Sequence, residues 1–278
     1  MILYHTGTGN SRLVALRLAD ILEDRVLRID AYTPHAFRLK PLEKIVWVFP
    51  VYCWGIPPEV VRYIRSLQLE NPSAVEQFMV CTCGDDVGLT AEQWLNEINK
   101  RGWFACGRYS IQMPNNYVLL PGFDVDPDDE ELRKLVIAEI RTKEVGKKIM
   151  ENSELFANDV VKGSMAWLKS RVLYPLFCRF LMSPKPFKAT ADCVGCGKCS
   201  RVCPRENIAL NANHRPEWGG DCAMCLGCYH VCPHHAVAYG RVTRTKGQYF
   251  APQEFPGYQE RLRVMEILEA RLRKLRGK

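Results

Sequence analysis

Two hydrophobic patterns alternate along the first half of the chain. Five short apolar runs predict β-strands, at residues 1–5, 26–29, 44–49, 78–81 and 103–113. Apolar residues at helical spacing predict four helices, at about residues 13–24, 57–69, 90–101 and 127–152. The run 44–49 is apolar after Lys44, which is typical of a parallel strand buried on both faces. The alternation of strands and helices predicts an α/β fold with a doubly wound parallel sheet over residues 1–152.

The pattern changes after residue 152. Residues 153–186 mix large apolar side chains with lysine and arginine, and predict a basic amphipathic connector. The connector can cover the first domain and pack against the next one, or it can lie on a membrane surface. We expect the former and therefore no membrane association. Residues 187–245 hold short apolar runs between cysteines and predict a small α+β domain, and residues 246–278 predict a C-terminal helical extension.

Length and composition fit a cytoplasmic protein of two domains. The chain has 278 residues, 47% of them hydrophobic and 25% charged, which is ordinary for a globular protein. No apolar run is long enough to predict a transmembrane helix. The first residues lead directly into an apolar strand and do not resemble an export signal. Thirteen cysteines without such a signal favour a reduced, cytoplasmic setting.

A polar loop joins the first predicted strand to the first helix. It consists of Thr6, Gly7, Thr8, Gly9, Asn10 and Ser11. Glycines let backbone N–H groups approach an anion, hydroxyl groups can donate to it, and the N-terminus of a helix favours negative charge. The loop therefore predicts a phosphate cradle, although Asn10 or Ser11 can also serve only as the N-cap of the helix. It is not a Walker A motif, because it has no lysine.

Two more loops follow strands at the edge where open α/β sheets place their ligands. One contains Tyr52, Trp54 and Gly55. Its aromatic rings can flank a flat ligand or pack as a lid on the core of the protein itself. The other contains Cys83, Gly84 and Asp85.

In this order, the three loops resemble those of flavodoxin, over about residues 1–150 of the chain. The resemblance implies an FMN cofactor. The first loop would hold the phosphate, and backbone groups of the other two would contact the isoalloxazine ring. The third loop departs from the family because it lacks the aromatic residue that usually precedes the next helix.

Eight of the thirteen cysteines form two copies of the pattern Cys-x2-Cys-x2-Cys-x3-Cys-Pro. The first copy contains Cys193, Cys196, Cys199 and Cys203, and the second contains Cys222, Cys225, Cys228 and Cys232. Structural zinc usually takes two well-separated pairs of cysteines, so an unbroken triplet fits zinc poorly. Disulfide bonds fit poorly as well, because no secretory signal is recognised.

The repeated pattern resembles that of bacterial ferredoxins with two [4Fe-4S] clusters. In those proteins the last cysteine of each copy binds the other cluster. The resemblance therefore implies one cluster on Cys193, Cys196, Cys199 and Cys232, and another on Cys222, Cys225, Cys228 and Cys203.

Nearly the whole chain is similar to the fused flavodoxin–ferredoxin proteins of anaerobic bacteria and archaea. The resemblance implies an electron-transfer iron–sulfur flavoprotein that couples one-electron and two-electron redox partners. The alternative is an FMN-dependent reductase of a small organic substrate, fed with electrons by the clusters. Redox proteins are the expected partners, and no side chain is assigned a catalytic role.

The formal charge of +7 does not require a nucleic acid partner. Two oxidised clusters contribute roughly −2 each and a flavin phosphate roughly −2, which leaves a net charge of about +1. On this reasoning much of the basic charge offsets the cofactors of the protein itself.

Overall fold

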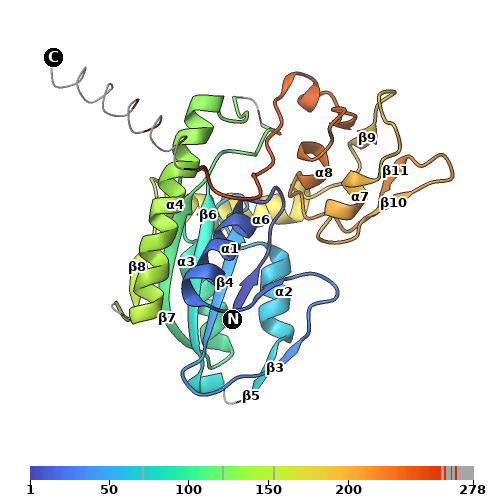
Figure 1. Cartoon of the computed structure of the whole chain (residues 1–278). Coiled ribbons are helices and arrows are strands. Elements are labelled where there is room, and N and C mark those ends of the chain that lie inside the picture. The colour runs from blue at the N-terminus through green and yellow to red at the C-terminus, as the bar shows by residue number, and fades with distance from the viewer. Residues whose placement is uncertain are drawn as a thin grey trace.

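A parallel sheet forms the centre of the larger domain (Figure 1). The computed structural model describes residues 1–70, 72–120, 122–152 and 154–257, together with residues 260, 264 and 267. Its six-stranded sheet has the order β2-β1-β4-β6-β7-β8, and all neighbouring strands are parallel. The strands are β1 (Ile2–Tyr4), β2 (Val26–Arg28), β4 (Lys44–Pro50), β6 (Glu76–Cys83), β7 (Phe104–Gln112) and β8 (Ala157–Asp159). Without β8 the order is that of flavodoxin, which confirms the predicted fold class.

Four helices cover the two faces of this sheet. They are α1 (Asn10–Leu22), α2 (Pro58–Ser66), α3 (Thr90–Lys100) and α4 (Asp128–Glu151). The side chains of β4 alternate between two buried clusters: Trp47 packs with α2 and α3, whereas Val46 and Val48 pack with α1 and α4. Burial on both faces explains why β4 is apolar without interruption.

In the larger domain, three short strands were not predicted from the sequence. β8 extends the main sheet, and β3 (Ala36–Arg38) pairs in parallel with β5 (Gln68–Glu70) outside it. Each has three residues and contains polar side chains, so no hydrophobic period marks it. A short 3₁₀ turn, η1 (Pro72–Ala74), follows β5.

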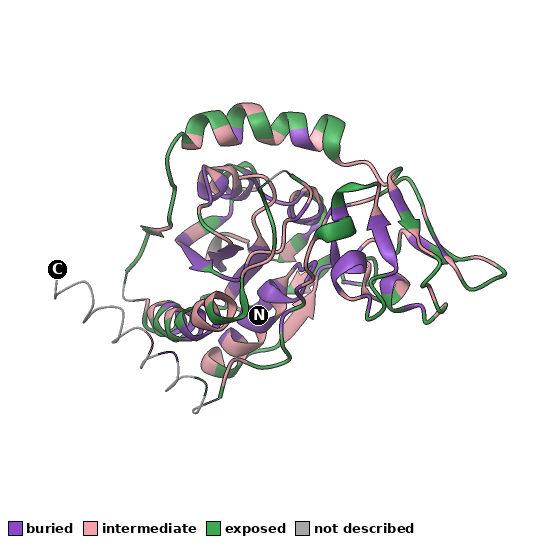
Figure 2. Ribbon diagram, turned by 90° about the horizontal axis from the view of Figure 1, so that it is seen from above, coloured by how far each residue is buried: buried purple, intermediate pink, exposed green. Residues whose placement is uncertain are grey.

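The connector contains one helical stretch that changes hydrogen-bonding register. Its segments are α5 (Ala166–Leu168), the π-helical η2 (Lys169–Leu173), α6 (Tyr174–Leu176) and the π-helical η3 (Phe177–Leu181). Pro175 has no N–H to donate, and π-helical turns lie on both sides of its α-helical turn. Figure 2 shows this helix at the edge of the molecule, with much of its outward surface exposed.

The cysteine-rich segment forms a small module of short elements. They are β9 (Phe187–Ala189), α7 (Lys198–Val202), β10 (Ile208–Leu210), β11 (Pro216–Trp218), α8 (Gly227–His230), β12 (Val237–Tyr239) and the 3₁₀ turn η4 (Val242–Thr245). β9 pairs with β12 and β10 with β11, both antiparallel. Ile208 and Leu210 thus lie in β10, and Val237 and Tyr239 lie in β12.

A buried ion pair joins the module to the larger domain. Arg205, two residues after Cys203, pairs with Glu59 in the first turn of α2, and their side chains are only 7% and 8% exposed. Arg205 also pairs with Asp221. Nearby, the Arg28 guanidinium donates a hydrogen bond to the Val202 carbonyl at 3.1 Å.

The chain beyond the module returns to the larger domain. The N–H group of Ala251 donates a 2.8 Å hydrogen bond to the carbonyl of Thr8. Most of the expected C-terminal helical extension, 246–278, lies outside the described residues. Within the part of the chain that the structure describes, no helix has the length and apolar character needed to cross a bilayer.

The buried ion pair allows a test of how the two parts are held together. Replacing Arg205 with Met leaves Glu59 buried with only the longer contact to Arg62 (3.5 Å), and we expect destabilisation of about 3 kcal/mol. Arg38→Met is the matched control, because Arg38 and Glu70 are 87% and 62% exposed and their pair contributes under about 1 kcal/mol. The measurement is the urea midpoint of each variant, and equal midpoints would contradict the role of Arg205.

Candidate functional site

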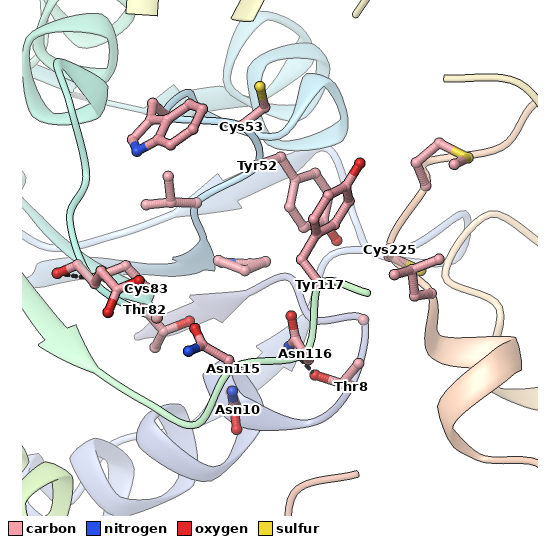
Figure 3. A pocket seen from close by; sticks show the side chains of 18 of the residues that line it. Thr8, Asn10, Tyr52, Cys53, Thr82, Cys83, Asn115, Asn116, Tyr117 and Cys225 are labelled. Atoms are coloured by element: carbon pink, nitrogen blue, oxygen red, sulfur yellow. Dashed lines mark hydrogen bonds between the residues drawn. The ribbon is translucent and has the colours of Figure 1, made fainter. Parts of the chain in front are cut away.

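A cavity of about 380 Å³ lies at the carboxyl ends of β1, β4, β6 and β7. Ten of the twelve residues expected to bind a flavin line it: Thr6, Gly7, Thr8, Asn10, Ser11, Tyr52, Trp54, Cys83, Gly84 and Asp85. Thr8 and Cys225 lie toward one side of the cavity and Cys83 toward the other (Figure 3). The three predicted loops therefore come together around one space.

The first loop is shaped by Gly9, the N-cap of α1. Its φ of 98° lies in the left-handed region, which disfavours a side chain. Asn10 and Ser11 are not the N-cap, so that alternative is wrong. Asn10 donates to the Pro114 carbonyl at 3.0 Å and accepts from the Tyr249 hydroxyl at 2.6 Å. Ser11 pairs with Thr82 at 2.8 Å between their hydroxyl oxygens.

The two threonines of this loop keep their hydroxyl hydrogens for another partner. The Thr6 Oγ1 atom accepts from the Gly9 N–H at 3.1 Å, and the Thr8 Oγ1 atom accepts from the Asn116 amide at 2.6 Å. Since both oxygens act as acceptors, both O–H groups remain able to donate. The first N–H groups of α1 have no acceptor within the helix. Together these donors suit an anion such as a phosphate.

The second loop is a strained turn that the connector helix holds in place. Tyr52 and Gly55 exchange backbone hydrogen bonds of 2.9 and 3.0 Å, while Cys53 and Trp54 have φ values of 47° and 59°. Two successive residues with positive φ are costly without glycine, and such strain is typical of ligand sites. Gly55 does not line the cavity but lies directly beneath the ring of Tyr174.

The connector contributes side chains that the sequence did not reveal. Ser170 donates to the Trp54 carbonyl at 2.7 Å and accepts from the Leu89 N–H at 2.7 Å. Lys169 lines the cavity and pairs with Asp86 at 2.7 Å, with its Nζ atom 5.0 Å from the centre of the Trp54 ring. Phe177 and Leu181 also line the cavity, and they place apolar surface there although the third loop lacks an aromatic residue.

The eight motif cysteines lie in two groups, and the assignment of each group to one cluster rests on the ferredoxin resemblance. Cys193, Cys196, Cys199 and Cys232 line a second, smaller cavity. In the other group, burial raises the pKa of Cys228, and the neighbouring Cys225, Cys222 and Cys203 raise it further. Within the described residues, no three His, Cys, Asp or Glu side chains are arranged to hold a single metal ion.

The phosphate-type loop and the second cysteine group meet at two glycines. A Cβ atom on Gly7 would lie 2.7 Å from both the Cβ and the carbonyl oxygen of Cys225. A Cβ atom on Gly227 would lie 2.6 Å from the carbonyl oxygen of Gly7. These distances are shorter than van der Waals contact, so the two backbone segments can approach this closely only because residues 7 and 227 are both glycine. Cys225 consequently lines the large cavity together with Met224 and Leu226.

His230, the last residue of α8, also links the module to the larger domain. Its Nδ1 atom accepts from the Tyr249 N–H at 3.1 Å, and its Nε2 atom lies 2.7 Å from the Asn116 carbonyl. A neutral ring with its proton on Nε2 satisfies both partners. Burial lowers the pKa of His230 to about 4, which keeps the ring neutral.

Comparison with known proteins identifies the cysteine module. Residues 185–233 match the 4Fe-4S dicluster domain family. No curated protein matches the chain. The chain therefore combines a flavodoxin-like domain with a 4Fe-4S dicluster domain, and the latter is a redox module.

Solved structures of low similarity match about half of the chain. They include an azoreductase from Bacillus anthracis (10% identity, 54% of this chain and 98% of that one, TM-score 0.36). A Trp repressor binding protein from Bacillus subtilis matches with 11% identity over 54% and 96% of the two chains, at a TM-score of 0.33. An NAD(P)H:quinone oxidoreductase from Methanothermobacter marburgensis matches with 10% identity over 53% and 94%, at 0.30. The fold itself rests on the strand order described above.

The free hydroxyl of Thr8 predicts a measurable contribution to anion binding. Thr8→Val removes the hydroxyl group that can donate to the anion and the oxygen atom that accepts the hydrogen bond of the Asn116 amide. For the FMN that the resemblance implies, we expect the affinity to fall at least about tenfold. Thr245→Val, at an exposed position, should leave affinity unchanged. Fluorescence titration of the flavin-free protein measures both, and unchanged affinity in Thr8→Val would contradict the phosphate assignment.

The contact at Gly7 predicts a second effect. Gly7→Ala forces apart the first loop and the Cys225 segment. For the flavin and the cluster that the two resemblances imply, we expect weaker flavin retention and slower electron exchange between them. Gly220→Ala is the control, because a Cβ atom there meets nothing within 4 Å. Flavin content and transient absorbance report the two effects. Flavin content and electron-exchange rates in Gly7→Ala equal to those of the wild type would show that the close backbone contact does not contribute to function.

Proposed function

We propose that the protein is an electron-transfer iron–sulfur flavoprotein, in which two [4Fe-4S] clusters exchange electrons with FMN. The observation that carries this proposal is the position of Cys225. It belongs to the second cysteine group and also lines the cavity formed by the three flavodoxin-type loops. A cluster on that group would lie against a flavin in that cavity. We retain the expected division at residues 152, 186 and 245 as part of this proposal.

The loops would share the binding of FMN. Thr6, Thr8 and the N–H groups at the start of α1 would bind the phosphate, while Asn10 and Ser11 hold the loop to its neighbours. The ring would be surrounded by Tyr52, Trp54, Cys83, Gly84 and Asp85, whereas Gly55 would only shape the second loop. FMN supplies an exchange between one-electron and two-electron chemistry that cysteine-bound clusters lack.

The cluster groups differ in how close they lie to solvent. Cys196 is exposed and so is the neighbouring Val194, whereas none of the four cysteines of the other group is exposed. The group of Cys193, Cys196, Cys199 and Cys232 would therefore exchange electrons with an external redox protein. The group of Cys222, Cys225, Cys228 and Cys203 would connect it to the flavin.

One feature favours the alternative of a reductase with its own small substrate. Leu120, Phe123 and Leu181 line the cavity and are 44%, 44% and 54% exposed. They give the cavity an apolar rim that an organic molecule can contact. Turnover of a small acceptor without any partner protein, at the rate of flavin oxidation, would favour this alternative.

The relay predicts unequal effects for two cysteine substitutions. Anaerobically purified protein should contain about eight iron atoms and one FMN, and Cys225→Ser and Cys196→Ser should each retain about four iron atoms. Single-electron reduction should still reach the flavin rapidly in Cys196→Ser, because the cluster beside the cavity remains. In Cys225→Ser it should be slow.

Transient absorbance of the flavin after a photochemical pulse measures these rates. Equal rates in the two variants would contradict the order of the relay. Zinc in place of iron in the wild-type protein would contradict the clusters, and absence of FMN would contradict the flavin site.

A further inference from the structure

The helix of residues 165–181, here the surface helix, exposes large apolar side chains although it is anchored on the protein. Its outward residues include Met165, Trp167, Leu168, Leu176 and Phe180, which are 67%, 66%, 43%, 46% and 64% exposed. Exposed apolar side chains gathered on one element are typical of an interaction surface. The expectation that the connector covers the larger domain therefore explains only the inward face of the surface helix.

The opposite face fixes the helix firmly. Ser170 and Phe177 are buried, Ser170 bonds to the second loop, and the Tyr174 hydroxyl donates to the Ile56 carbonyl. Since the helix is already formed and anchored, binding through its outer face would need no folding of this segment.

The charged residues within the segment that contains the surface helix have one sign. Residues 160–191 contain no Asp or Glu and six basic residues: Lys162, Lys169, Arg171, Arg179, Lys185 and Lys188. Lys162 pairs with Glu92 and Lys169 with Asp86. Within the described residues, Arg171, Arg179, Lys185 and Lys188 have no carboxylate partner within ion-pair distance.

We propose that the surface helix docks the protein on an anionic lipid bilayer. Trp167, Leu168 and Phe180 would enter the boundary between headgroups and acyl chains, while Arg171 and Arg179 would contact lipid phosphates. An interfacial helix combines these features: apolar and aromatic side chains, basic side chains and a length too short to span the bilayer. A symmetric contact between two copies through this face would bring the unpaired arginines together, which is unfavourable.

Docking in this way would also place the large cavity near the bilayer. Leu181 ends the surface helix, is 54% exposed and lines that cavity. An apolar molecule dissolved in the bilayer could therefore reach the rim formed with Leu120 and Phe123. The docking itself does not depend on the proposed electron relay.

Flotation of the cofactor-loaded protein with vesicles tests the docking. We compare phosphatidylcholine vesicles with vesicles in which part of the lipid is phosphatidylglycerol, at low and high salt. The wild-type protein should float with the anionic vesicles, less so at high salt. Arg171→Gln with Arg179→Gln should weaken binding to anionic vesicles about 30-fold. Trp167→Ser with Phe180→Ser should weaken it at least about tenfold.

A matched pair on α4 controls for exposed residues in general. Ile140→Ser with Lys147→Gln changes an apolar residue that is 56% exposed and a lysine whose side chain is 69% exposed, and it should bind as the wild type does. Absorbance of flavin and clusters verifies that each variant is intact. Absence of flotation with every vesicle, or equal losses in the α4 control, would overturn the proposal. A surface helix that binds a second copy of the chain or an acidic carrier protein instead of lipid would show no flotation with any vesicle.

Discussion

The backbone contact between Gly7 and Cys225 is the constraint on which the arrangement of the two domains depends. A flavodoxin-type loop and a cysteine loop come from separate domains, yet a single added methyl group at Gly7 or Gly227 would separate them. The surrounding contacts hold this approach in place. Arg205 pairs with Glu59 on one side, and His230 bridges Asn116 and Tyr249 on the other. The interface thus brings two potential redox sites together without any covalent link at that point.

The parallel sheet explains why the cavity forms where it does. The loops after β1, β4, β6 and β7 meet at one edge because parallel strands all end there. The sequence therefore predicted the fold class, the main strands and the three loops from local patterns alone. The apolar run of β4 predicts a strand clearly, because both faces of β4 are buried. In contrast, β3, β5 and β8 have three residues each and show no hydrophobic periodicity.

The parts of the site that the sequence did not reveal come from tertiary contacts. Nothing in the local pattern marks Lys169 or Leu181 as cavity residues, because the connector reaches the cavity only after the domain has folded. In the same way Asn10 looks like an N-cap in the sequence, but Pro114 and Tyr249 hold its side chain across the fold. A motif predicts which residues gather, and the long-range partners decide which of them remain available to a ligand.

The distribution of charge limits how far the net charge of +7 can be explained by bound cofactors. Arg205 fits that explanation, because it lies beside the second cysteine group, where burial raises the pKa of Cys222 and the charge of Arg205 opposes that rise. The connector does not fit it. From residue 160 to its end the connector contains no acidic residue, and Arg171 and Arg179 are exposed on the helix while Lys169 lines the cavity. Basic residues on an outward apolar face attract a partner outside the protein. The net charge therefore combines two contributions, one that offsets bound cofactors and one that attracts such a partner.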